Sequence, residues 1–140
     1  MALMPVADAL SAILNGAKPL PEEMVALDAA HHRVLARDVA ARRTQPPQAM
    51  SAMDGYAVRA SDASDVKARL KVIGEVAAGR PFERRVGAGE AVRIFTGGVI
   101  PDGADAVIIQ EDTALDGDSL TITEAAVKGR HIRAAGVDFR

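Results

Sequence analysis

Ala91-Val-Arg-Ile-Phe-Thr-Gly-Gly98 is the stretch of sequence that decides the fold. Its first five residues contain β-branched and aromatic side chains, and Thr-Gly-Gly then interrupts the run, which is typical of a short strand ending in a turn. Four similar runs lie around it, at 56–59, 70–74, 106–110 and 119–123. Short strands at this spacing predict a compact sandwich or barrel-like β domain. Asp116-Gly-Asp118, just before the last run, predicts a hairpin.

The residues before this β-rich part have a different pattern. Residues 5–15 carry apolar side chains at helical spacing and are followed by a glycine, which predicts a helix. We expect a short strand at 23–27 and a short helix at 29–36, before Pro46-Pro47 interrupts regular structure. The last residues are polar and are expected to turn back onto the N-terminal segment.

These elements predict an α+β fold that is mostly β. A small helix-plus-strand N-terminal region would consist of residues 1–45 and 130–140. The compact β domain, residues 46–129, would be inserted into it.

Composition excludes several classes of function. The 140 residues are 49% hydrophobic and 26% charged, which is ordinary for a soluble folded protein. A net charge of −2 with no Trp, one Tyr and three Phe argues against nucleic-acid binding. The absence of cysteine excludes disulfides and thiolate metal sites. No apolar run approaches the ~18–20 residues of a membrane span, and the start does not resemble a secretory signal. We therefore expect a cytoplasmic protein without a membrane or nucleic-acid partner.

The segment Ser51-Ala-Met-Asp-Gly-Tyr-Ala57 is the first candidate for chemistry. Asp54 in an Asp-Gly turn could bind a cationic group or act as an acid or base. A plain turn leading into a strand is the favoured alternative on spacing alone, because Asp-Gly turns are common. Ser51 is a weak nucleophile candidate, since no Gly-x-Ser-x-Gly pattern surrounds it.

The second candidate is Thr96-Gly97-Gly98, where a strand runs into two glycines. Successive backbone N–H groups and a hydroxyl could form a concavity that binds an anion such as phosphate. A plain Gly-Gly turn ranks higher on local grounds. The segment is not a Walker loop, because no Gly-Lys-Ser/Thr follows.

Two further segments are polar. Gln110-Glu-Asp112 could seek a metal, but a solvated acidic edge that blocks strand pairing is the favoured alternative. Arg133, with Asp138 nearby, could bind an oxyanion, because the guanidinium group is well shaped for one. An exposed pair in a polar tail is the alternative, and the sequence does not separate the two.

Three of these segments, in register, resemble the molybdopterin molybdenumtransferase family, which includes the C-terminal domain of gephyrin. The family's Ser-x-Met-Asp-Gly-Tyr-Ala signature matches residues 51–57, and its Ile-Arg-x-x-Gly-x-Asp signature matches 132–138. Its Arg-Ile-x-Thr-Gly signature, with the Pro-x-Gly turn and the strand ending in Gln-Glu, matches residues between 93 and 111. The likeness covers essentially the whole chain. Ala49-Met50 and Val137 depart from the residues common in the family.

The resemblance implies that the chain is the N-terminal part, domains I and II, of an enzyme that inserts molybdate into adenylylated molybdopterin with the help of Mg²⁺. The enzyme would be a homodimer in which this chain forms one wall of an intersubunit cleft. A missing C-terminal pterin-binding domain would complete that cleft, so the chain alone is expected to be inactive. The expected catalytic residues are Asp54 and Thr96, and the expected substrate-binding residues are Ser51, Gly97, Arg133 and Asp138. No metal ligand is assigned.

The resemblance also makes a molybdopterin adenylyltransferase a candidate partner. The alternative function is a non-catalytic dimerisation or partner-binding module that retains the family fold. Such a module would bind neither molybdate nor the pterin nucleotide.

Overall fold

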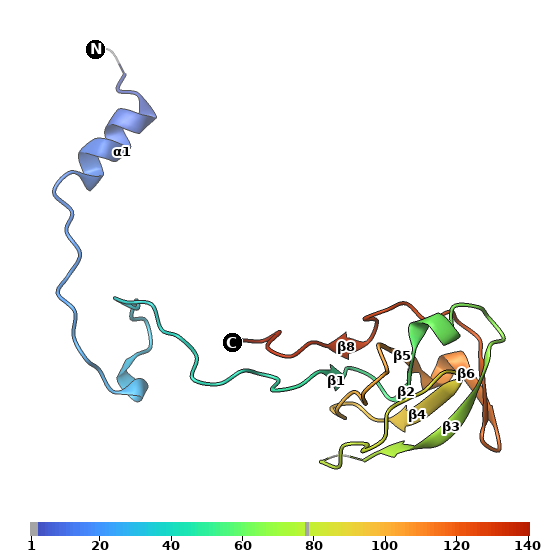
Figure 1. Ribbon diagram of the computed structural model, residues 1–140. Helices are drawn as coiled ribbons and strands as arrows, with labels where there is room; N and C mark the ends of the chain where they lie inside the picture. The colour runs from blue at the N-terminus through green and yellow to red at the C-terminus, as the bar shows by residue number, and fades with distance from the viewer. Residues whose placement is uncertain (1–2, 78) are drawn as a thin grey trace. The chain divides into compact units, whose positions relative to one another are not determined.

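Strand β4 (Glu90–Ile94) contains residues 91–94 of the Ala91–Gly98 stretch and lies inside a six-stranded sheet in the computed structural model (Figure 1). The structure describes residues 3–77 and 79–140. The chain divides into two compact units, Met1–Val39 and Ala40–Arg140, and the sheet belongs to the second. The fold is mostly β with one α-helix in the described residues, which confirms the predicted class.

The strands of the sheet lie in the order β5 (Ala106–Ile109), β2 (Gly55–Val58), β4, β3 (Arg69–Val76), β7 (Ser119–Ile122) and β6 (Thr113–Asp116). Strands β3 and β4 pair in parallel, and the other neighbours are antiparallel. All five predicted strands are present. Strand β6 is an additional, largely exposed edge strand.

The predicted hairpin is confirmed between β6 and β7. Asp116 is opposite Ser119, so Gly117 and Asp118 form a two-residue loop. The positive φ of 60° at Gly117 is what a type II′ turn requires at its first central residue.

The core lies on both faces of the sheet, because successive side chains of a strand point to opposite sides. In β2, Tyr56 and Val58 belong to one apolar cluster and Ala57 to the other. The first cluster also contains Ala63, Leu70, Ala91, Ala106, Ile108, Leu120 and Ile122, and the second contains Val76, Val86, Val92, Ile94 and Val107. Both faces of the central strands are therefore buried, and the core is largely aliphatic.

A two-stranded ladder joins the start and the end of the second unit. Strand β1 (Met50–Ser51) pairs with β8 (Ile132–Arg133), and Gln45 forms an isolated bridge with Phe139. The final stretch therefore turns back on residues 45–51, directly before the sheet. These residues belong to the same unit as the sheet, and residues 1–39 form the other unit. Single 3-10 turns connect other elements, namely η2 (Ala60–Asp62) after β2 and η3 (Gln110–Asp112) after β5.

The first unit contains the predicted helix, α1 (Val6–Leu14), which is followed by the C-cap residue Asn15 and by Gly16 in a left-handed conformation. The predicted strand at 23–27 and helix at 29–36 are wrong. The structure has a 3-10 turn instead, η1 (Leu27–Ala29), and His32 has a φ of 64° that interrupts a right-handed helix. No side chain of residues 3–39 is buried in the structure, and a short helix without a packed face is marginal.

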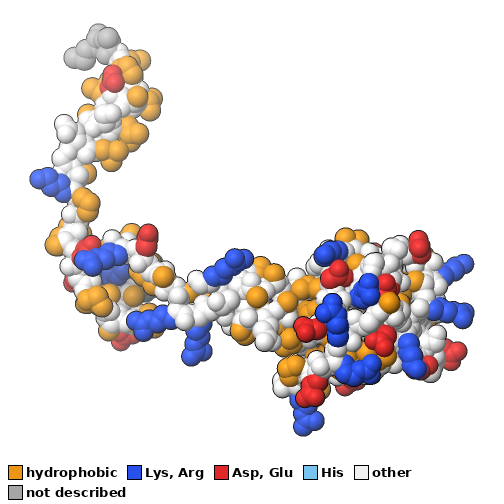
Figure 2. Space-filling view, in the orientation of Figure 1, with side chains coloured by type: hydrophobic (Ala, Val, Ile, Leu, Met, Phe, Trp, Pro, Cys, Tyr) orange, Lys and Arg blue, Asp and Glu red, His pale blue; other side chains and the backbone are white. Residues whose placement is uncertain are grey.

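Apolar side chains gather over α1 in the space-filling view (Figure 2). Among them, Val6 and Ile13 are 86% and 76% exposed. Within the described residues, no helix is both long and apolar enough to cross a membrane. The predicted domain boundaries at 45/46 and 129/130 stay a prediction.

Candidate functional site

Asp54 lies in the loop between β1 and β2, and the loop that follows β4 holds its side chain. The backbone N–H of Thr96 and the Thr96 hydroxyl both donate to Asp54 Oδ1, each over 2.7 Å. The two residues are 42 positions apart in sequence. Strands β2 and β4 bring them together, because these strands pair antiparallel with Gly55 opposite Ile94.

The glycine of the Asp-Gly sequence, Gly55, is required by the packing of two strands. A Cβ added to Gly55 would lie 1.9 Å from the backbone oxygen of Ile108. Strand β2 therefore approaches β5 so closely at this position that only glycine fits. The close approach fixes the start of β2, and with it the place of Asp54. The segment is more than a common turn.

The backbone donors of Thr96-Gly97-Gly98 do not form the anion-binding nest that was considered beside a plain turn, because other groups of the chain accept their hydrogen bonds. Besides the Thr96 N–H, which binds Asp54, the Gly97 N–H donates to Ser51 O over 2.9 Å. The Gly98 N–H donates to Phe95 O over 2.8 Å. The oxyanion that this loop holds is thus the carboxylate of Asp54. A role of Gly97 in substrate binding stays a prediction, and its N–H group is already used within the fold.

Ser51 is a buried residue whose hydrogen bonds link the Asp54 loop to the loop that follows β4. It is 1% exposed, and its N–H donates to Gly98 O over 2.8 Å. Its hydroxyl donates to Met53 O over 2.6 Å. The hydroxyl thus stabilises the loop that carries Asp54. A contact of Ser51 with substrate stays a prediction.

The hydrogen bonds from Thr96 hold the pKa of the Asp54 carboxyl below its ordinary value, and the nearby positive charge of Arg93 adds to this effect. Partial desolvation opposes it. Asp54 is therefore an ionised carboxylate at neutral pH. Such a group can bind a cation or accept a hydrogen bond, and it is a poor general acid at that pH.

Arg133 and Asp138, the other predicted site residues, pair with each other. The Nη2 atom of Arg133 lies 2.6 Å and 2.7 Å from the two carboxylate oxygens of Asp138. Both side chains are partly exposed. The pair is joined to the first loop through the β1–β8 ladder, in which Ser51 is opposite Ile132. The structure thus brings Ser51, Asp54, Thr96 and Gly97 into one cluster, and Arg133 and Asp138 into a second that the ladder connects to it.

The acidic segment Gln110–Asp112 forms the turn η3 directly after β5, one of the two edge strands of the sheet. Within the described residues, no group of three or more His, Cys, Asp or Glu is placed to hold a metal ion. A role of this segment in blocking strand pairing stays a prediction.

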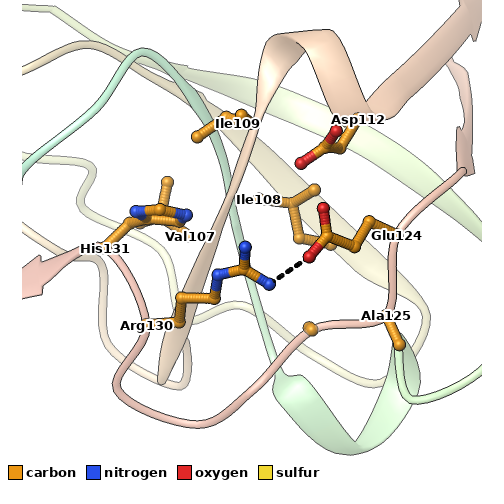
Figure 3. Close-up of a pocket in the computed structure, with 9 residues that line it drawn as sticks. Val107, Ile108, Ile109, Asp112, Glu124, Ala125, Arg130 and His131 are labelled. Atoms are coloured by element: carbon orange, nitrogen blue, oxygen red, sulfur yellow. Dashed lines mark hydrogen bonds and ion pairs between the residues drawn. The ribbon is translucent and has the colours of Figure 1, made fainter.

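Sequence reasoning missed a shallow hollow beside this edge (Figure 3). Asp112, Glu124, Arg130 and His131 line it, together with β5. Arg130 forms an ion pair with Glu124, which lowers the pKa of Glu124. Desolvation and the neighbouring Glu124 raise the pKa of Asp112. These residues come from segments that have no pattern in common, so the sequence carried no signal for the hollow.

Comparisons with known proteins agree with these features. Residues 4–140 match the family model described as the MoeA N-terminal region, domain I and II. The chain is 40% identical over 123 residues to a molybdopterin molybdenumtransferase of Haemophilus influenzae, covering 87% of this chain and 30% of that protein. It is 36% identical over 141 residues to the one of Staphylococcus aureus strain Mu50, covering 98% of this chain and 34% of that protein.

A crystal structure of a molybdopterin biosynthesis moeA protein from Pyrococcus horikoshii OT3 has the same fold, with a TM-score of 0.83 and 35% identity. That match covers 99% of this chain and 38% of the other. The chain thus spans about a third of the length of the relatives that it matches.

Proposed function

The chain belongs to the family of MoeA N-terminal regions, domains I and II, and from this premise we propose that it is part of an enzyme that inserts molybdate into adenylylated molybdopterin. The loop of Asp54 and Thr96 would line one wall of the active cleft. The names of the relatives support the reaction. The two hydrogen bonds from Thr96 to Asp54 are the observation that supports placing this loop at the cleft. They join residues of two separate family signatures at one ionised group.

The residues present fit a Mg²⁺ ion for which the substrate phosphates would supply some of the ligands. Protein-bound Mg²⁺ commonly uses one or two carboxylates, with water and substrate phosphates as its other ligands. Asp54 would supply one carboxylate through Oδ2, since Oδ1 accepts both bonds from Thr96. When bound, the ion would neutralise negative charge on the phosphate as AMP leaves.

The chain's own residues would then bind the substrate and hold the reacting groups in a fixed orientation. Thr96 holds the Asp54 carboxylate ionised and in one orientation, so the group needs no reorganisation when a cation arrives. Arg133 would contact an oxyanion of the substrate, with Asp138 fixing the direction of its guanidinium plane. Molybdate and the phosphates are anions, so an arginine at this wall complements them.

The predicted homodimer and the pterin-binding domain belong to the same proposal. Large apolar side chains on α1, such as Leu10 and Ile13, are more than half exposed. Exposed apolar groups on one element are typical of a surface that another subunit or domain covers. This observation also favours the alternative of a non-catalytic partner-binding module, which has the same surface but no chemistry at Asp54.

A reconstitution experiment separates the two functions. The chain is combined with the remaining region of a relative such as the Haemophilus influenzae protein, and molybdenum insertion into adenylylated molybdopterin is measured. We expect insertion with both parts and none with the chain alone. A complex that assembles but inserts no molybdenum would favour the non-catalytic module. Insertion by the chain alone would show that it holds more than one wall of the cleft.

A further inference from the structure

Arg93 lies next to the Asp54 loop and has an unusually fixed side chain. It is on β4 directly opposite Tyr56 of β2. Its guanidinium carbon is 5.1 Å from the centre of the Tyr56 ring and 4.8 Å from the centre of the Phe95 ring. Both distances are within the range of cation–π contacts. Two aromatic rings therefore restrict the guanidinium group.

The guanidinium group makes two hydrogen bonds in different directions. Nη1 donates to the carbonyl oxygen of Gly55 over 3.2 Å, and Nη2 donates to Gln110 Oε1 over 2.7 Å. The backbone N–H of Gln110 donates in turn to the carbonyl oxygen of Asp54 over 3.1 Å. Two consecutive carbonyl groups, those of Asp54 and Gly55, are thus held from the ends of β4 and β5. This contact is separate from the one that Thr96 makes with the carboxylate.

We propose that Arg93, acting with Gln110, is a positioning residue that fixes the backbone at Asp54 and so aims the carboxylate at Thr96. The inference rests on the proposed function only in that the aimed carboxylate is taken to serve the reaction. The aromatic rings fix the plane of the guanidinium group, and its fork reaches the Gly55 carbonyl and the Gln110 amide at once. A lysine has a single nitrogen at its end and cannot span both acceptors in this way.

The test is amide hydrogen exchange measured by NMR on the 140-residue chain. In Arg93→Lys we expect the amides of Thr96 and Gln110 to exchange at least about tenfold faster, because the loop opens more often. Arg69→Lys, the same substitution at an exposed arginine of β3 in the same sheet, should leave both rates unchanged. Unchanged rates in Arg93→Lys would overturn the inference.

Substitutions at Gln110 test the other half of the contact without altering Arg93. Gln110→Leu removes the acceptor and should accelerate exchange at Thr96 as Arg93→Lys does. Gln110→Glu keeps an acceptor and should retain the slow exchange. If Arg93→Lys does not fold, the comparison of these two variants decides, and equal exchange in both would overturn the inference.

Molybdenum insertion, measured with the same variants in the reconstituted enzyme, separates this inference from the proposed function. Faster exchange with at least about tenfold slower insertion supports both. Faster exchange with normal insertion leaves the positioning role standing and shows that opening of this loop does not limit the reaction, so the role of Asp54 itself is decided by Asp54→Asn. Normal exchange with slower insertion contradicts positioning and leaves the proposed function standing.

Discussion

Thr96 gives both its backbone N–H and its hydroxyl to the same oxygen of Asp54, and each hydrogen bond is 2.7 Å long. Two loop residues that are 42 positions apart in sequence are thereby fixed as one unit. The acceptor is ionised at neutral pH, and charge-assisted hydrogen bonds of this kind are stronger than neutral ones. The arrangement explains why an exposed carboxylate keeps a defined direction.

Removing the hydroxyl of Thr96 should change the titration of Asp54. In Thr96→Ala we expect the pKa of Asp54 to rise towards its ordinary value, because one of the bonds that favour the carboxylate form is lost. Thr96→Ser keeps the hydroxyl and should retain the low pKa. Carbon-13 NMR titration of the Asp54 carboxyl measures both. An identical pKa in Thr96→Ala and the parent chain would show that the hydroxyl does not act on Asp54.

The low pKa of Asp54 also predicts a dependence of stability on pH. The unfolded chain binds more protons at Asp54 than the folded chain between the two pKa values, so the stability from this group rises with pH across that window. It is fully present above the ordinary pKa of 3.8 and is lost as the pH falls through the lower folded value. The difference in unfolding free energy between the parent chain and Asp54→Asn should therefore shrink as the pH is lowered below 3.8. Urea unfolding at several pH values measures it, and a constant difference would contradict the prediction.

Gly55→Ala tests the close approach of β2 to β5. The added Cβ would meet the backbone oxygen of Ile108 at 1.9 Å, and backbone cannot move aside as the end of a side chain can. We expect a loss of stability of about 3 kcal/mol or more, in the range of severe overpacking.

Gly87→Ala is the matched control, because its Cβ would meet only the carboxylate end of Glu90, at 3.1 Å. It should change stability by less than about 1 kcal/mol. Chemical denaturation gives both values. Similar losses in the two variants would show that the contact at Gly55 is not special.

The two carboxyl groups beside Arg130 should respond to neutralisation in opposite ways. The pKa of Asp112 is raised, so its charge is unfavourable in the fold above pH 3.8, and Asp112→Asn should raise the melting temperature at pH 7. The pKa of Glu124 is lowered, mainly by the hydrogen bond from Arg130, so Glu124→Gln should reduce the melting temperature. Thermal unfolding at pH 7 compares them. A shift of the same sign in both variants would contradict the assignment of the favourable charge to Glu124.

Most strands of the sheet and the hairpin turn could be predicted from the sequence, because neighbouring residues alone have the composition that these elements require. The run Ala91–Phe95 has the composition of a strand, and Gly117 supplies the conformation that the hairpin turn needs. Strand β6 was missed because its residues are mostly exposed and have no apolar alternation. Strands β1 and β8 have two residues each and exist only through their pairing, which a local pattern does not record.

The errors in the first unit have a similar cause. The short apolar run at 23–27 has the composition of a strand, but no partner strand forms a ladder with it in the described residues. At 29–36, the left-handed conformation of His32 interrupts the predicted helix. Short segments without a buried face give too weak a signal to decide between these structures.

The candidate site could be predicted only in part. Its residues were named through the resemblance to a family, whereas local spacing favoured plain turns at both Asp54 and Thr96. The bond between them joins residues 42 positions apart, so it depends on the pairing of β2 with β4. The Thr-Gly-Gly pattern is compatible with either a plain turn or an anion nest, and it does not show that Asp54, Ser51 and Phe95 accept the N–H donors of this loop.

Molybdenum insertion by Asp54→Asn tests the central claim most directly. The variant is made in the enzyme reconstituted from this chain and the remaining region of a relative, with Asp65→Asn, an exposed aspartate outside the predicted site, as the control. We expect Asp54→Asn to fold and assemble normally and to insert molybdenum at least about a hundredfold more slowly, the scale on which single acid–base or charge-stabilising groups contribute. Asp65→Asn should insert it at the parent rate. Insertion at the parent rate by Asp54→Asn would contradict the role of this carboxylate in the cleft.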